Sequence, residues 1–282
     1  YCVNVQAHKT KLLYITFVNY NRAVYIHMTI MLIIGIFSFL VVMGILNSSI
    51  NVFGHANPVL YNPPSNSIFQ LDQLLPTNVT IIYSERPETK ASYIHVLNSL
   101  SERVDNNDFK IIGQNERGAV VTVDSTKLSN GTYTVSWLVL SKDDGHITKG
   151  SYVFTITDTS KTTTTTTKDV EANTFLERTV IAKVNLEYEI TPLQIGINTF
   201  TITLKDENNK PLSNINNVIM QFTNQNQNIG PIIANLEKTR DGAYSITGAY
   251  MSQEGEWNVK ITVQRTGQYD LNHSFDISIP SK

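Results

Sequence analysis

The chain has 282 residues, with 22 basic and 24 acidic side chains and a formal net charge of −2. Lys9, Lys11 and Arg22 are the only formal charges before His55, which leaves 19 basic and 24 acidic residues, a net charge of −5, downstream. Nucleic-acid-binding proteins need a basic surface to neutralise phosphates, so this balance argues against a nucleic-acid partner. The single cysteine, Cys2, excludes an intramolecular disulfide and a downstream thiolate metal site.

One long apolar segment runs from Ile30 to Leu46. Its length lies between the ~7–15 residues of a signal-peptide core and the ~20 residues of a membrane-spanning anchor. Val52 and Gly54 stand at the −3 and −1 positions before His55, as small residues do at signal-peptidase sites. We therefore expect residues 1–54 to hold an upstream region and a signal peptide or signal anchor, with cleavage before His55 favoured.

The basic residues near the apolar segment all precede it. By the positive-inside rule, the rest of the chain then lies outside the cytoplasm. We expect an extracytoplasmic protein of the periplasm or cell surface, either secreted or associated with the membrane through the N-terminal apolar segment.

The composition favours β-structure, because Thr, Asn, Val, Ile and Tyr are plentiful and helical periods are scarce. Turn residues separate short β-type runs, which predict strands at 78–83, 92–97, 119–123, 132–140 and 151–156, and again at 182–188, 198–204, 218–222, 242–246, 255–263 and 274–277. Such spacing is typical of sandwich folds. The predicted fold class is all-β, with two Greek-key immunoglobulin-like β-sandwich domains.

A run of six threonines, Thr162 to Thr167, lies between the two groups of strands. Its apolar content is too low for a packed core, so it is typical of a tether. We expect one domain at 55–158, a Thr-rich linker at 159–179 and a second domain at 180–282.

Chemistry is concentrated at Asp144-Gly145-His146, between two predicted strands. Residues two apart on an extended segment face the same side, and the glycine lets the backbone bend between them. Such a tripeptide is usually a hairpin turn. A His55 freed by cleavage would add an imidazole and an α-amine, whose ordinary pKa of ~8 lets a metal displace its proton. Nitrogen and oxygen donors of this kind suit Cu(II).

The order of motifs from His55 to Ile156 resembles the CopC family of extracytoplasmic copper-binding proteins. The resemblance rests on His55-Ala56-x-Pro58, Pro63-Pro64-x-Asn66, Tyr83-Ser84-Glu85-x-Pro87, Gly131-Thr132-Tyr133-Thr134-Val135-Ser136-Trp137, Asp144-Gly145-His146 and Gly150-Ser151-Tyr152-x-Phe154. It implies Cu(II) ligation by the amine and ring of His55, the carboxylate of Asp144 and the ring of His146. No methionine falls between His55 and Val218, so we expect no Met-rich Cu(I) site.

Four further residues of the first domain receive secondary predictions. Glu85 either orients a ligand through its other ring nitrogen or is an exposed residue at a strand end. Asp143 is an additional acid that competes with Asp144 or is simply solvated. His95 is expected to face away from the core toward solvent, and Trp137 to pack in the core.

The second half resembles the YtkA-like domain found beside CopC and CopD modules. The residues that carry this resemblance are Pro192-Leu193-x-x-Gly196-x-Asn198-x-Phe200, Asp206 to Pro211, Gly230-Pro231, Asp241-Gly242-x-Tyr244 and Gly255-x-Trp257. Relatives often have Met where Asn226-Gln227-Asn228-Ile229 stands, and His273 with Met251 is a weak metal pair, so this domain is expected to dock a partner or act as a spacer.

The leading functional hypothesis is a non-enzymatic copper carrier or buffer that passes Cu(II) to a cuproenzyme or to a membrane copper transporter, such as a CopD-like one. The first alternative is a copper monooxygenase in which an N-terminal histidine chelates the metal through amine and ring. The second is a structural cell-surface protein of two sandwich domains, which predicts no stoichiometric copper.

Overall fold

The structure is a computed structural model that describes Met31, residues 55–158 and residues 173–280. The predicted signal segment, apart from Met31, lies outside the described residues, as do the threonine run and the residues just before His55. Within the ranges described, no helix is long and apolar enough to span a membrane.

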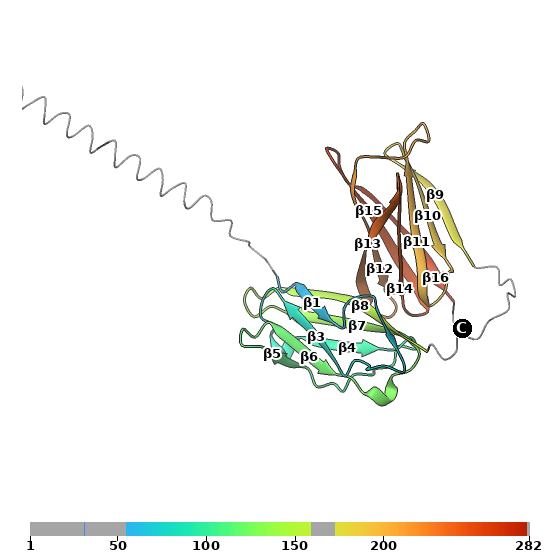
Figure 1. The fold of residues 1–282 in the computed structure, drawn as a ribbon. Helices are drawn as coiled ribbons and strands as arrows, with labels where there is room; N and C mark the ends of the chain where they lie inside the picture. The colour runs from blue at the N-terminus through green and yellow to red at the C-terminus, as the bar shows by residue number, and fades with distance from the viewer. Residues whose placement is uncertain (1–30, 32–54, 159–172, 281–282) are drawn as a thin grey trace, which may run out of the picture. The chain divides into compact units, whose positions relative to one another are not determined.

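The first domain contains eight strands and two short 3-10 turns (Figure 1). They are β1 Pro58–Asn62, β2 Ser67–Gln70, β3 Asn78–Tyr83, η1 Thr89–Ala91, β4 Tyr93–Leu97, β5 Lys110–Ile112, β6 Gly118–Thr122, η2 Ser125–Lys127, β7 Gly131–Leu140 and β8 Ile147–Thr157. The strands form two four-stranded sheets, ordered β1-β3-β6-β5 and β2-β8-β7-β4. Side chains of both sheets form one buried core, so the domain is a β-sandwich.

Alternation of side chains explains which residues fill this core. In β3, Val79, Ile81 and Tyr83 are buried while their neighbours are more exposed, as the period of two requires. Trp137 of β7 is 6% exposed and packs edge-on against Tyr83. Its predicted place in the core is confirmed.

Strands β1, β2 and β5 were not among the predicted strands. Each lies at the edge of its sheet and is five residues long or shorter. Asn57-Pro58 and Asn62-Pro63-Pro64 are typical of turns, yet β1 begins at Pro58, because an edge strand tolerates a residue without an N–H donor. Short edge strands have too few buried positions to show a clear alternation.

The second domain is built from one eight-stranded antiparallel sheet, ordered β16-β15-β12-β13-β14-β11-β10-β9. The strands are β9 Phe175–Ile181, β10 Val184–Thr191, β11 Gly196–Lys205, β12 Ile215–Asn224, β13 Ile229–Arg240, β14 Ala243–Met251, β15 Gly255–Arg265 and β16 Leu271–Ile279. β13 pairs with β12 along Ile229–Leu236 and with β14 from Glu237 onward, so it joins two layers of a sandwich.

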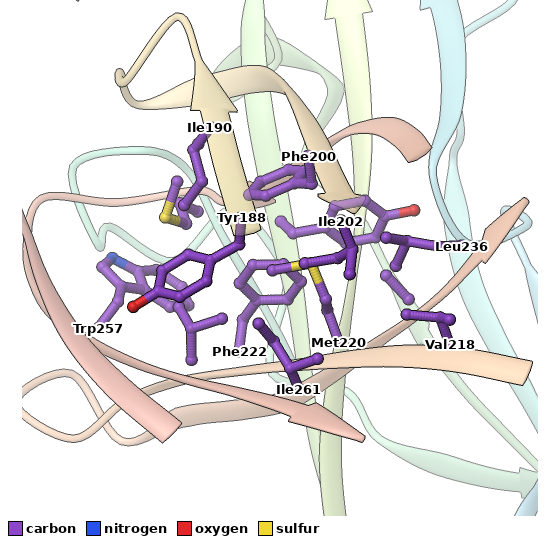
Figure 2. Packing of buried hydrophobic residues seen from close by; sticks show 14 of the residues in the cluster. Tyr188, Ile190, Phe200, Ile202, Val218, Met220, Phe222, Leu236, Trp257 and Ile261 are labelled. Carbon is purple, nitrogen blue, oxygen red and sulfur yellow. The ribbon is translucent and has the colours of Figure 1, made fainter. Parts of the chain in front are cut away.

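The core of the second domain lies between these layers. Tyr188, Phe200, Phe222 and Trp257 are fully buried, and Figure 2 shows their side chains gathered between the strands. Aromatic contacts also join the two outermost strands, since Phe175 of β9 stacks on Phe275 of β16 with ring centroids 5.7 Å apart. The sheet therefore folds over a single core.

β9 was not predicted, and it begins at Phe175, inside the range expected for the linker. It pairs with β10 from Phe175↔Ile190 to Ile181↔Val184. The second sheet therefore starts before Val180. The exposed residues Leu176 to Arg178 hide the alternation of this edge strand.

Trp257 is the residue whose truncation should most weaken the second domain. It has no exposed surface, and its Nε1 donates a hydrogen bond to the Gln253 carbonyl oxygen at 3.0 Å. We predict that Trp257→Ala lowers the free energy of unfolding by about 3–5 kcal/mol, because it leaves a large cavity. Chemical denaturation followed by circular dichroism measures the change. Tyr269→Ala is the control, since Tyr269 is 94% exposed; equal losses in both variants would contradict the packing argument.

Candidate metal centre

The Asp144-Gly145-His146 tripeptide lies in a tight turn between β7 and β8. The Ser141 N–H donates to the His146 carbonyl oxygen at 2.8 Å, and the Gly145 N–H donates to the Ser141 carbonyl oxygen at 3.0 Å. Gly145 has φ +74°, a left-handed conformation that glycine adopts without strain. The strands continue directly from the turn, with Leu140 opposite Ile147.

Asp144 is the centre of the candidate site. Its Oδ1 accepts a hydrogen bond from the His146 backbone N–H at 3.0 Å. Its Oδ2 lies 3.0 Å from His146 Nδ1, 3.2 Å from His55 Nδ1 and 3.0 Å from the His55 backbone nitrogen. The backbone hydrogen bond from His146 is the main cause that holds the pKa of Asp144 well below its usual range, and the contacts with both imidazoles act in the same direction. The carboxylate is therefore ionised and ready to bind a cation.

The two imidazoles lie beside each other at this carboxylate. Their ring centroids are 4.4 Å apart at an angle of 61°. Among the described residues, His55, Asp144 and His146 form the one group of three or more His, Cys, Asp or Glu whose ligand atoms lie within 4.8 Å of one another. Donors bound to one first-row metal at about 2 Å lie within about 4 Å of each other, so small side-chain movements would complete the site.

His55 is held in place by its neighbours rather than by its own side chain alone. The Ser84 hydroxyl donates to the His55 carbonyl oxygen at 2.8 Å and accepts from the Asn57 N–H at 2.9 Å. Ala56 is fully buried, and its carbonyl oxygen accepts from the Thr148 hydroxyl at 2.7 Å. These contacts fix the start of the domain beside the β7–β8 turn.

Glu85 lies beside the turn that carries Asp144 and contacts its first residue, Ser141. Its carboxylate accepts a hydrogen bond from the Ser141 hydroxyl at 2.6 Å, and it is partly buried. The Ser141 oxygen in turn accepts from the N–H groups of Asp143 and Asp144, at 3.1 and 3.2 Å. Glu85 thus supports the turn through Ser141, and within the described ranges its carboxylate makes no hydrogen bond or ion pair with an imidazole ring.

Asp143 is exposed, and it forms an ion pair that the sequence did not predict. Its carboxylate is paired with Arg86, whose Nε donates to Oδ1 at 2.7 Å and whose backbone N–H donates to Oδ2 at 2.9 Å. The side-chain hydrogen bond from Arg86 is the main cause of a lowered pKa for Asp143. Sequence gave no signal for this pairing, because 57 residues separate the partners.

The other two described histidines, His95 and His273, lie outside the candidate site. His95 faces away from buried Ile94 and Val96, as predicted, yet it is only partly exposed because it stacks on Tyr93 with ring centroids 4.3 Å apart. His273 packs beside Tyr188, with its Nε2 3.4 Å from the phenol oxygen. Met251 is completely buried in the core of the second domain.

Comparison with protein families gives two matches. Residues 70–157 match the model described as CopC domain, and residues 181–262 match the model described as YtkA-like. The first match contains Asp144 and His146, whereas His55 precedes it. Among curated proteins, no relative matches the chain.

Solved structures similar to the chain include CopC from Methylosinus trichosporium OB3b, at 27% identity over 37% of this chain and 96% of that one, with a TM-score of 0.33. PcoC, a methionine-rich copper resistance protein from Escherichia coli, has 22% identity over 36% of this chain and 99% of its own, with a TM-score of 0.29. A tetra-tandem repeat of a large adhesion protein is similar over 76% of this chain at 17% identity, with a TM-score of 0.26.

Proposed function

Because the chain carries a CopC domain followed by a YtkA-like domain, we propose that it is an extracytoplasmic Cu(II)-binding protein of copper homeostasis or resistance. The observation that supports this proposal most directly is the meeting of His55, Asp144 and His146 at one carboxylate oxygen. Two imidazoles, a carboxylate and the amine that cleavage before His55 would create form a nitrogen-rich donor set. Cu(II) prefers such donors and heads the affinity series of divalent ions.

The oxidation state follows from the donors that are present. No methionine lies between His55 and Val218, so the CopC domain offers no thioether for Cu(I). Met220 and Met251, in the second domain, are buried in its core. The site therefore serves Cu(II).

Exposure of the site fits a protein that passes its metal on. The side chains of His55, Asp144 and His146 are 47%, 27% and 62% exposed. A partner can reach such a site and exchange ligands one at a time. The carrier or buffer delivers Cu(II) to a cuproenzyme or a membrane copper transporter of the CopD kind, and the YtkA-like domain acts in docking or spacing.

Copper titration of the chain that begins at His55 tests this proposal. We expect one tightly bound Cu(II) per chain, an electron paramagnetic resonance spectrum with nitrogen couplings, and no displacement by an equal concentration of Zn(II). Ascorbate is then added with oxygen, and we expect no catalytic turnover.

Two results would overturn the proposal. Absence of stoichiometric copper would leave a structural cell-surface protein. Sustained ascorbate-driven oxidation of a substrate would instead indicate a copper monooxygenase, the enzymatic alternative for a histidine that chelates through amine and ring.

A further inference from the structure

Arg86 and Asp143 form an ion pair beside the candidate copper site. Asp143 Oδ1 accepts from both Nε and Nη2 of the guanidinium, and Oδ2 accepts from the Arg86 backbone N–H. Arg86 therefore donates hydrogen bonds to both oxygens of the Asp143 carboxylate, one from its backbone and the others from its side chain. The pairing restrains the backbone and the side chain of Arg86 together. We call this pair the Arg86–Asp143 clamp.

Backbone contacts join the same two segments. The Lys142 N–H donates to the Arg86 carbonyl oxygen at 2.7 Å, and the Glu88 N–H donates to the Leu140 carbonyl oxygen at 2.8 Å. Pro87 and Ser141 form an isolated antiparallel bridge between them. The segment after β3 thus runs beside the start of the metal-binding turn.

Charges around the clamp alternate in sign. Glu116 lies 3.9 Å from Arg86 Nη1 and 3.3 Å from Lys142 Nζ, measured from its Oε2. Two basic and two acidic side chains, counting Asp143, therefore form one surface network. Opposite charges lie within 4 Å of each other in this network, so their fields at the copper site partly cancel, and Arg117 adds a further positive charge near Asp143. We therefore expect the main effect of the clamp on the site to be geometric.

The clamp controls the direction of two adjacent carboxylates. Asp143 turns toward Arg86, while Asp144 Oδ2 faces His55 and His146. Releasing Asp143 would free a second carboxylate next to the metal and loosen the peptide that carries Asp144. Sites in which ligands are already oriented lose less conformational entropy when the metal binds.

The three residues Ser84-Glu85-Arg86 contact both halves of the site. Ser84 holds the His55 carbonyl oxygen, Glu85 holds the Ser141 hydroxyl and Arg86 holds Asp143. His55 and Asp144 are 89 residues apart, so this segment is a physical link between them.

We propose that Arg86 and Asp143 are positioning residues of the Cu(II) site, which set its affinity without binding the metal. This inference rests on the proposed copper function. The clamp leaves the ligand set unchanged and reduces the movement of Asp144 and His146 before the metal arrives.

Arg86→Gln, Asp143→Asn and the double variant test the clamp in the chain that begins at His55. We expect each single variant to raise the Kd for Cu(II) about 10-fold, the lower end of the effect of outer-shell partners. The double variant should bind Cu(II) no more weakly than either single variant, because all three variants lose the same contact. In Asp143→Asn and in the double variant, which leave no carboxylate at position 143, the electron paramagnetic resonance parameters should not change, since the ligands remain.

The direction of the Arg86→Gln effect separates geometry from simple electrostatics. Removing a positive charge near a cation would by itself tighten Cu(II) binding, whereas removing Asp143 would weaken it. The clamp predicts weaker binding in both cases. The Kd of Arg86→Lys for Cu(II) should lie between those of Arg86→Gln and the wild type. Lysine keeps the positive charge but lacks the planar guanidinium that binds a carboxylate through two N–H groups.

Arg178→Gln is the matched control, since Arg178 Nε pairs with Glu187 in the second domain. It should leave the Kd for Cu(II) unchanged. Tighter or equal binding by Arg86→Gln, with wild type still binding one copper, would overturn the clamp and leave the proposed function intact. A wild-type chain that binds no copper would overturn both.

Discussion

Replacing Asp144 with alanine is expected to raise the Kd for Cu(II) more than about 100-fold. Partners outside the ligand shell already contribute about 10–100-fold to metal affinity, so a lost ligand should exceed that range. Asp144 also contacts both imidazoles, which lose their common carboxylate in this variant. Competition with a chelator of known affinity measures the change.

Asp144→Asn separates metal binding from the shape of the turn. An asparagine carbonyl oxygen can still accept the hydrogen bond from the His146 N–H, so the turn should persist. The negative charge is lost, and we expect the affinity to fall nearly as far as in Asp144→Ala. Asp72→Ala, at another exposed acid of the same domain, is the control. Wild-type affinity in Asp144→Asn would show that the carboxylate is not a ligand.

Retaining Gly54 in front of His55 is the second change with a large expected effect. A peptide nitrogen shares its electron pair with the neighbouring carbonyl, so it cannot replace a free amine as a donor at neutral pH. The extended chain keeps all three side chains and loses the chelate ring between the amine and Nδ1. We expect the Kd for Cu(II) to rise at least about 100-fold, again because a ligand is removed.

The comparison requires two chains that differ only at the N-terminus. One begins at Gly54 and the other at His55, and the His55 chain with one residue added after Lys282 serves as the length control. Mass spectrometry of the protein from its producing cells then shows which form exists. Equal affinity of the two chains would mean that cleavage plays no part in copper binding.

The strand prediction succeeded where alternation is strong, and it missed four edge strands, β1, β2, β5 and β9, and the internal strand β13. The predicted strand 78–83 coincides with β3, where burial alternates residue by residue. β9 and β13 were missed for different reasons: β9 is an edge strand with three exposed residues in succession, and β13 contains Gly230-Pro231 near its start. A Gly-Pro pair is typical of a turn. In β13 the pairing with β12 outweighs this local preference.

The supporting residues of the site were the least predictable part. Ser84 belongs to a motif that carries the family resemblance, but no local pattern shows which residue Ser84, Arg86 or Ser141 will contact. For Glu85 the sequence left two alternatives, orientation of a ligand or an exposed place at a strand end, and neither specified its hydrogen bond with Ser141. The ion pair of Asp143 with Arg86 was missed because Arg86 follows a different strand, far from Asp143 in the sequence.

The sequence by itself determined the all-β class, the two-domain order and the local geometry of Asp144-Gly145-His146, because periodicity and turn chemistry act over a few residues. The tertiary structure alone decided that the His55 backbone nitrogen and ring lie within 3.2 Å of the Asp144 carboxylate, and that Arg86 forms an ion pair with Asp143. Both contacts join segments 57 to 89 residues apart. The packing of the two sheets brings the partners of each contact together. The residues next to them in the sequence give no indication of that packing.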